Sequence, residues 1–135
     1  MPHVTPAQGE LLQVELAFQH QVSASAAYRA LPRGPIHADL FRDNVMFEPG
    51  DLGHERLCGF FDFYFAGVDS LLFDIAVCLN AWAFERRGEY NLTKGKALIA
   101  GYETVRRLEP RERSAIPVLA RGAAMRFFLT RLVDL

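Results

Sequence analysis

The sequence has little net charge and few cysteines. Over its 135 residues, 15 Lys and Arg residues stand against 16 Asp and Glu residues, which gives a formal net charge of −1. Such a balance provides no broad basic field, so composition gives no reason to expect a nucleic-acid or membrane partner. The two cysteines, Cys58 and Cys78, both lie in apolar runs. This placement favours two buried thiols over a disulfide and indicates a cytoplasmic protein.

Long apolar runs are also missing. No stretch approaches the roughly 18–20 apolar residues of a membrane-spanning helix, and residues 1–9 lack the basic and apolar segments of a secretion signal. Half of the residues are apolar and 23% are charged, as in an ordinary globular protein. We therefore expect a soluble, cytoplasmic domain with a modest core.

Hydrophobic periodicity predicts that most of the chain is helical. The first helix is expected to begin at Thr5, because Thr5 can cap it, Pro6 suits the first helical position and Gln8 can complete a capping box. The segment Pro32–Pro35 is expected to end this helix.

Three further helices are expected, over residues 70–88, 92–105 and 114–135. Asn91 or Thr93 can cap the middle one of these. Gly122 lies inside the last and suggests a close contact between helices.

A small β region is expected between the first and second helices. Short apolar segments predict strands at residues 36–37, 45–47 and 57–61, with a turn over residues 48–51. Strands this few and short are not stable alone, so they must lie on helices. The predicted fold class is α+β, mostly helical with a small β-hairpin region.

The polar residues that suit chemistry lie in the loops of this region. Residues 36–45 contain the pattern H-x-D-x-x-x-x-N between two apolar segments, and Asp62 ends the next strand in the run Phe-Phe-Asp-Phe. Phosphoryl transfer needs an acceptor hydroxyl placed in line and the phosphate charge neutralised. Asp39 fits the group that accepts or orients the hydroxyl proton. Asn44 and Asp62 offer the hard oxygen ligands that Mg²⁺ prefers.

These motifs resemble those of a known superfamily. Residues 31–41 resemble the catalytic loop of aminoglycoside phosphotransferases and choline kinases, which resemble protein kinases in fold. Residues 59–66, 73–82 and 121–132 resemble the bacterial homoserine kinases of that superfamily. The resemblance covers residues 31–135 and implies a protein-kinase-like C-terminal lobe whose β-hairpin region carries the catalytic loop.

The resemblance also implies an activity. Asp39 would be the catalytic base, and Asn44 and Asp62 would bind Mg²⁺ and thereby the cofactor ATP. The implied reaction converts L-homoserine and ATP to O-phospho-L-homoserine, a step in threonine biosynthesis. Two residues have structural roles instead. His37 is expected to hold the loop rather than act as a base, and Asp74 to support the catalytic loop through its backbone.

Five residues are candidates for binding the acceptor: Tyr64, Asp69, Trp82, Arg126 and Arg131. The two arginines could pair with an amino-acid carboxylate, because an Arg fork matches a carboxylate bidentately. A solvated face is the common alternative for helical arginines, and plain core packing is the alternative for Trp82. The mixed-charge run 106–113 is expected to be a solvated junction between helices.

One part of the family pattern is missing. Such kinases have an N-terminal lobe with a phosphate-covering loop and a lysine, whereas here no glycine-rich loop follows a strand. The lysines, Lys94 and Lys96, both lie on an expected late helix. We therefore expect residues 1–135 to form a partial catalytic lobe without the N-terminal nucleotide lobe, and the isolated chain to be inactive.

Three alternatives remain open at this point. The acceptor could be another small hydroxyl compound, such as choline, an aminoglycoside or a sugar; a choline-type acceptor would favour an aromatic cage around the cation. The chain could be a non-catalytic fragment, which would expose apolar surface where another lobe docks. A metal-dependent hydrolase is the most distant alternative, since it would ordinarily need more His or carboxylate ligands.

Overall fold

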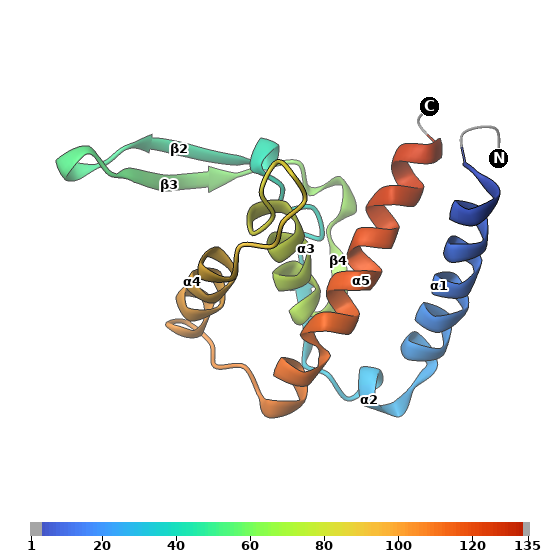
Figure 1. Cartoon of the computed structure of the whole chain (residues 1–135). Coiled ribbons are helices and arrows are strands. Elements are labelled where there is room, and N and C mark those ends of the chain that lie inside the picture. Colours follow the sequence, from blue (N-terminus) through green and yellow to red (C-terminus); the bar gives the residue numbers. More distant parts are fainter. Residues whose placement is uncertain (1–3, 134–135) are drawn as a thin grey trace.

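The structure is a computed structural model that describes residues 4–133. Figure 1 shows helices α1 and α5 side by side, α3 beside α5, and a two-stranded hairpin that projects away from the helices. The helices are α1 Pro6–Ala24, α2 Ala26–Arg29, α3 Leu72–Trp82, α4 Leu92–Glu103 and α5 Pro110–Val133. The strands are β1 Arg33–Ile36, β2 Val45–Pro49, β3 Glu55–Phe60 and β4 Gly67–Ser70.

The strands form two antiparallel pairs rather than one small sheet. β2 pairs with β3 as the projecting hairpin, and β1 pairs with β4, from Arg33 opposite Ser70 to Ile36 opposite Gly67. β4 was not predicted from the sequence, because Gly-Val-Asp-Ser has a single apolar side chain and shows no alternation. The predicted catalytic loop therefore connects the two sheets.

The first helix begins as predicted but ends early. The Thr5 and Gln8 side chains form the reciprocal capping box, with N···O distances of 2.9 and 3.3 Å. The helix stops at Ala24 because Ser25 is extended and its side chain caps the next helix by accepting a hydrogen bond from the Tyr28 N–H. The predicted continuation to Pro32 is therefore wrong.

Two later boundaries also differ. α3 ends at Trp82 rather than near Gly88, and a loop closed by a bridge between Phe84 and Tyr90 follows it. α5 starts at Pro110, four residues before the predicted start, because proline suits the first turn of a helix. The predicted cap of α4 is confirmed at Asn91, whose side chain accepts a hydrogen bond from the Lys94 N–H at 3.0 Å.

The core lies between α3 and α5. The buried α3 residues are Leu72, Ile75, Ala76, Val77 and Leu79, and they meet Leu119 and Ala123 of α5. A helix that is apolar on most sides requires partners on most sides, so α3 is the central element. The predicted close contact at Gly122 is confirmed, because a Cβ atom there would lie 2.7 Å from Gln19 Oε1 of α1.

The junction before α5 is mostly solvated, as predicted, but Glu112 within it is buried. Glu112 is 0% exposed, and its carboxylate accepts hydrogen bonds from the Arg106 guanidinium at 2.5 and 3.1 Å and from the Glu109 N–H at 3.0 Å. Burial acts to raise the pKa of Glu112, but these donors hold the pKa below its ordinary value. The alternating charges in the sequence concealed a buried ion pair.

The two cysteines differ in burial. Cys78 is largely buried, and this burial, with the Asp74 carboxylate nearby, raises the pKa of its thiol to about 12. Cys58 is exposed on β3, so the prediction that both thiols are buried is wrong for Cys58.

Within residues 4–133, no helix has the combined length and apolar character needed to cross a membrane.

Candidate active site

The loop after β1 is fixed to the first turn of α3. Asp74 accepts two backbone hydrogen bonds, from the His37 N–H at 2.9 Å and from the Ala38 N–H at 2.6 Å. The carboxylate also lies near the positive end of the α3 dipole, which favours its charge. One carboxylate thus holds the backbone of the two residues that precede Asp39.

His37 is buried beneath the same loop, and both ring nitrogens have partners. Its Nδ1 accepts a hydrogen bond from the Asp39 N–H at 3.3 Å, and its Nε2 lies 2.8 Å from the Phe61 carbonyl oxygen. These contacts require the neutral tautomer that carries its proton on Nε2. Neither nitrogen is free to take a proton from a substrate, so the ring connects the loop to the end of β3.

Ala38 has a positive φ of 65°, a backbone conformation that residues other than glycine rarely adopt. The turn is held from α5, where the Arg126 guanidinium donates a hydrogen bond to the Ala38 carbonyl oxygen. This guanidinium lies within 5 Å of the ring centres of Phe65 and Phe127. Burial lowers the pKa of Arg126, and the nearby Asp39 carboxylate opposes that shift. Arg126 thus belongs to the loop's support.

Asp39 is joined directly to Asn44. The Asn44 amide donates to the Asp39 backbone carbonyl at 2.8 Å and to Asp39 Oδ2 at 3.0 Å. Asn44 is buried in a short 3₁₀ turn that leads into β2. This arrangement uses the amide nitrogen of Asn44 internally and leaves its amide oxygen available to a ligand. It also leaves Asp39 Oδ1 without a hydrogen bond among the described residues.

The pairing of β2 with β3 brings Asp62 to the same place. Val45 lies opposite Phe60, and the Phe61 N–H donates to the Asn44 carbonyl at 3.0 Å. Asp62 therefore follows the strand end that adjoins Asn44. Its backbone is left-handed, with φ 61° and ψ 68°. Aspartate tolerates this conformation better than most residues, and such local strain is typical of functional positions.

The donor set suits a hard divalent cation. Within residues 4–133 the Asp62 carboxylate has no hydrogen bond or ion pair, and it is exposed. No group of three or more His, Cys, Asp or Glu residues that could hold a metal occurs among these residues. One carboxylate and one amide oxygen are too few for a zinc site, but they match Mg²⁺, which keeps several waters and binds substrate phosphates.

The structure places three of the predicted acceptor-binding residues in different surroundings. Tyr64 is 85% exposed beside the predicted site. The Asp69 carboxylate is already engaged, with Arg33 at 3.0 Å and the Tyr28 hydroxyl at 3.0 Å. Trp82 donates from its indole N–H to the Leu40 carbonyl at 2.9 Å. Asp69 and Trp82 thus support the fold around the loop.

The two predicted arginines also differ from each other. Arg126 contacts the catalytic loop, and its second terminal nitrogen, Nη2, is buried without a hydrogen-bond partner. Arg131 is exposed in the last turn of α5. Sequence reasoning did not find the Arg126–Ala38 contact, because the two residues are 88 positions apart and no local pattern joins them.

Residues 2–108 of the chain match the family described as the phosphotransferase enzyme family, APH. Curated relatives include the homoserine kinase of Polaromonas naphthalenivorans, which is 51% identical over 135 residues, corresponding to 99% of this chain and 41% of the relative. The homoserine kinase of Sinorhizobium fredii is 56% identical over 128 residues, corresponding to 90% of this chain and 38% of the relative. That of Xanthobacter autotrophicus is 59% identical over 106 residues, corresponding to 78% and 32%. The chain therefore spans about 40% of the length of the first two of these relatives.

Proposed function

Because the chain belongs to the phosphotransferase enzyme family, we propose that it carries the catalytic residues of an ATP-dependent homoserine kinase. The reaction transfers the γ-phosphoryl group of ATP to the hydroxyl of L-homoserine and gives O-phospho-L-homoserine, in the cytoplasm and toward threonine. The observation that carries this proposal is the hydrogen-bonded pair Asp39–Asn44 beside the unpaired Asp62. The curated relatives are named homoserine kinases, which supports this acceptor.

Asp39 acts on the acceptor hydroxyl. One of its carboxylate oxygens is held by the Asn44 amide, which fixes the plane of the group. The other oxygen is free to accept a hydrogen bond from the hydroxyl and to take its proton as the new P–O bond forms. Asp74 and Arg126 hold the Ala38 backbone that precedes Asp39, so the protein contributes mainly by positioning.

The side-chain oxygens of Asn44 and Asp62 would hold Mg²⁺ and, through it, the nucleotide. When bound, the ion neutralises charge on the ATP phosphates. The Asp62 carboxylate is exposed at the end of β3, and the orientation of Asn44 already turns its nitrogen toward Asp39. The absence of other hydrogen bonds to these oxygens among the described residues supports the proposed metal ligands.

We propose that a further lobe of the enzyme packs against an exposed apolar surface of this chain. The hairpin and the segment after it expose large apolar side chains at 44–57% of their area: Met46, Phe47, Leu57, Phe60, Phe61, Phe63 and Phe65. Exposed apolar surface of this extent indicates a protein contact. We infer that an N-terminal nucleotide lobe packs here in the complete enzyme and that residues 1–135 alone are inactive.

A chimera tests the function. The chain would replace the segment that it matches in the Polaromonas relative, and ADP release would be measured with Mg-ATP and L-homoserine, choline or an aminoglycoside. The isolated chain is the parallel sample. Homoserine-dependent turnover by the chimera, with none by the isolated chain, is the expected result.

Three other outcomes would each refute a different part of the proposal. Turnover with choline or the aminoglycoside but not with L-homoserine would keep the kinase and refute the acceptor. A folded chimera that is inactive with every acceptor, beside an active parent enzyme, would refute the claim that this chain carries competent catalytic residues. Turnover by the isolated chain would refute the need for a second lobe.

A further inference from the structure

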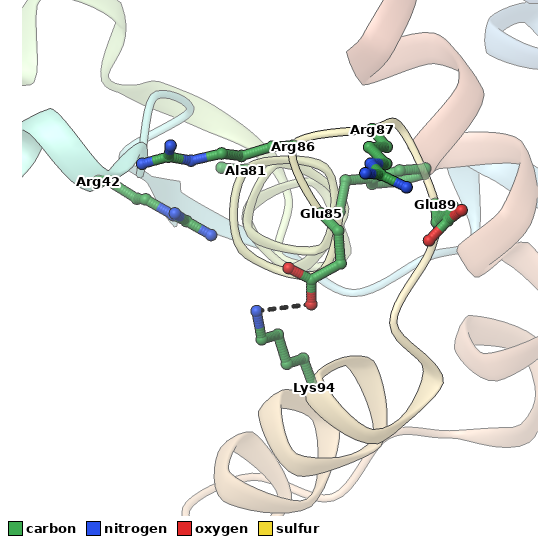
Figure 2. A pocket seen from close by; sticks show the side chains of 8 residues that line it. Arg42, Ala81, Glu85, Arg86, Arg87, Glu89 and Lys94 are labelled. Carbon is green, nitrogen blue, oxygen red and sulfur yellow. Dashed lines mark ion pairs between the residues drawn. The ribbon is translucent and has the colours of Figure 1, made fainter.

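A pocket lies at the end of α3, outside the Asp39–Asn44–Asp62 group. Its volume is about 600 Å³. Its lining comes from the catalytic loop, the end of α3, the loop that follows and the start of α4: Arg42, Ala81, Phe84, Glu85, Arg86, Arg87, Glu89 and Lys94. Figure 2 shows Glu85 and Lys94 in the middle of this pocket, with Arg42 to one side and Arg87 to the other.

The pocket has more cations than its carboxylates neutralise. Glu85 pairs with Lys94 Nζ at 2.8 Å and accepts a hydrogen bond from the Asn91 amide at 2.7 Å. These contacts lower the pKa of Glu85, so it is charged and satisfied. In the part of the chain that the structure describes, no carboxylate pairs with the arginines of the pocket: Arg42, Arg86 and Arg87.

We propose that this pocket binds a small oxyanion, either a phosphate or a carboxylate. Three guanidinium groups without carboxylate partners line one concavity, and a guanidinium fork matches either anion bidentately. Glu89 lines the same wall, and its carboxylate offsets part of the positive charge of the pocket. The proposed anion site follows from the geometry of the pocket and is independent of the proposed homoserine kinase activity.

Arg42 links the pocket to the catalytic loop. It lies between Asp39 and Asn44 in sequence, and its guanidinium carbon is 5.6 Å from the centre of the Trp82 ring. The Trp82 indole in turn donates to the Leu40 carbonyl. An anion that pairs with Arg42 changes the cation–π contact with Trp82. Occupancy of the pocket therefore acts on the loop that carries Asp39.

The contact between Arg42 and Trp82 also provides an assay of anion binding, because Trp82 is the single tryptophan of the chain. Its fluorescence would be followed during titration with inorganic phosphate and, separately, with acetate, against chloride at equal ionic strength. Saturation with phosphate alone identifies a phosphate subsite, and saturation with acetate alone identifies a carboxylate subsite. An equal, non-saturating change with phosphate, acetate and chloride would be general screening and would overturn the proposal.

Variants locate the site. The double variant R86Q/R87Q leaves the Arg42–Trp82 contact intact and should weaken binding roughly tenfold or more, since it removes two charge-assisted donors. The matched control R29Q/R107Q changes two exposed arginines outside the pocket and should bind as the unmodified chain does. Equal affinity in both double variants would overturn the assignment. Phosphate or acetate binding by calorimetry repeats the test without the fluorophore.

Discussion

Replacing Asp74 tests how the catalytic loop is held. In Asp74→Asn, one carbonyl oxygen remains for two N–H donors, those of His37 and Ala38. The new amide group faces the other donor and cannot accept from it. One hydrogen bond to a charged acceptor is therefore lost, and the other becomes a bond to a neutral one.

The expected change in the free energy of unfolding follows from these two hydrogen bonds. A hydrogen bond to a charged group contributes about 1.5–3 kcal/mol, against roughly 1 kcal/mol for a neutral pair. Replacing two hydrogen bonds to a charged acceptor by one hydrogen bond to a neutral acceptor should lower the free energy of unfolding by ~2–5 kcal/mol. Asp74 is partly exposed, so water compensates in part and the lower end, ~2–3 kcal/mol, is expected.

Urea unfolding followed by far-UV circular dichroism measures this loss. The matched control is Asp43→Asn, which removes an exposed carboxylate from the same loop and should change the free energy of unfolding by less than ~0.5 kcal/mol. Equal unfolding midpoints for Asp74→Asn and Asp43→Asn would refute the idea that Asp74 holds the loop.

The other predictions concern the helix junction, α5 and the thiols. Glu112→Gln should cost ~3 kcal/mol because Arg106 keeps a charge without its partner. Folding lowers the pKa of Glu112, so its ionised carboxylate stabilises the fold at pH values above the pKa of the unfolded state, ~4.3. This stabilisation is lost as the pH falls through the lower pKa of the folded state. The free energies of unfolding of Glu112→Gln and the parent should therefore converge in acid, and a difference that stays constant with pH would contradict this. Arg126→Met should lower kcat of the chimera more than it raises KM, with partial recovery in Arg126→Lys, whereas a change confined to KM would make Arg126 a substrate ligand. A thiol reagent should modify Cys58 at once and Cys78 only on unfolding, and equal rates would contradict the difference in burial.

Signals contained in a few neighbouring residues were sufficient to predict several local structures. The capping box at Thr5 and the cap at Asn91 depend on side chains within three residues of their backbone partners. The Asp39–Asn44 pair could be predicted for a similar reason, since the two residues share one loop. The spacing of the motif brought both side chains to one place, and the structure has them in contact.

Features that depend on distant parts of the chain were missed. β4 has almost no strand character of its own and forms because β1 offers an edge. Glu112 was missed although its partner Arg106 is only six residues away, because a run of alternating charges does not show which carboxylate the chain buries. Arg126 was one candidate for pairing with an acceptor carboxylate, and no local pattern could indicate that its guanidinium contacts the Ala38 carbonyl.

The central claim is that Asp39 accepts the proton of the acceptor hydroxyl. The measurement that tests it most directly is kcat for L-homoserine phosphorylation by the chimera with Asp39→Asn, beside Asp43→Asn as the control in the same loop. We expect kcat to fall roughly 10²–10⁴-fold for Asp39→Asn, with the control unchanged and both variants folded. Activity of Asp39→Asn within a few-fold of the parent chimera would refute the role of Asp39 as the proton acceptor.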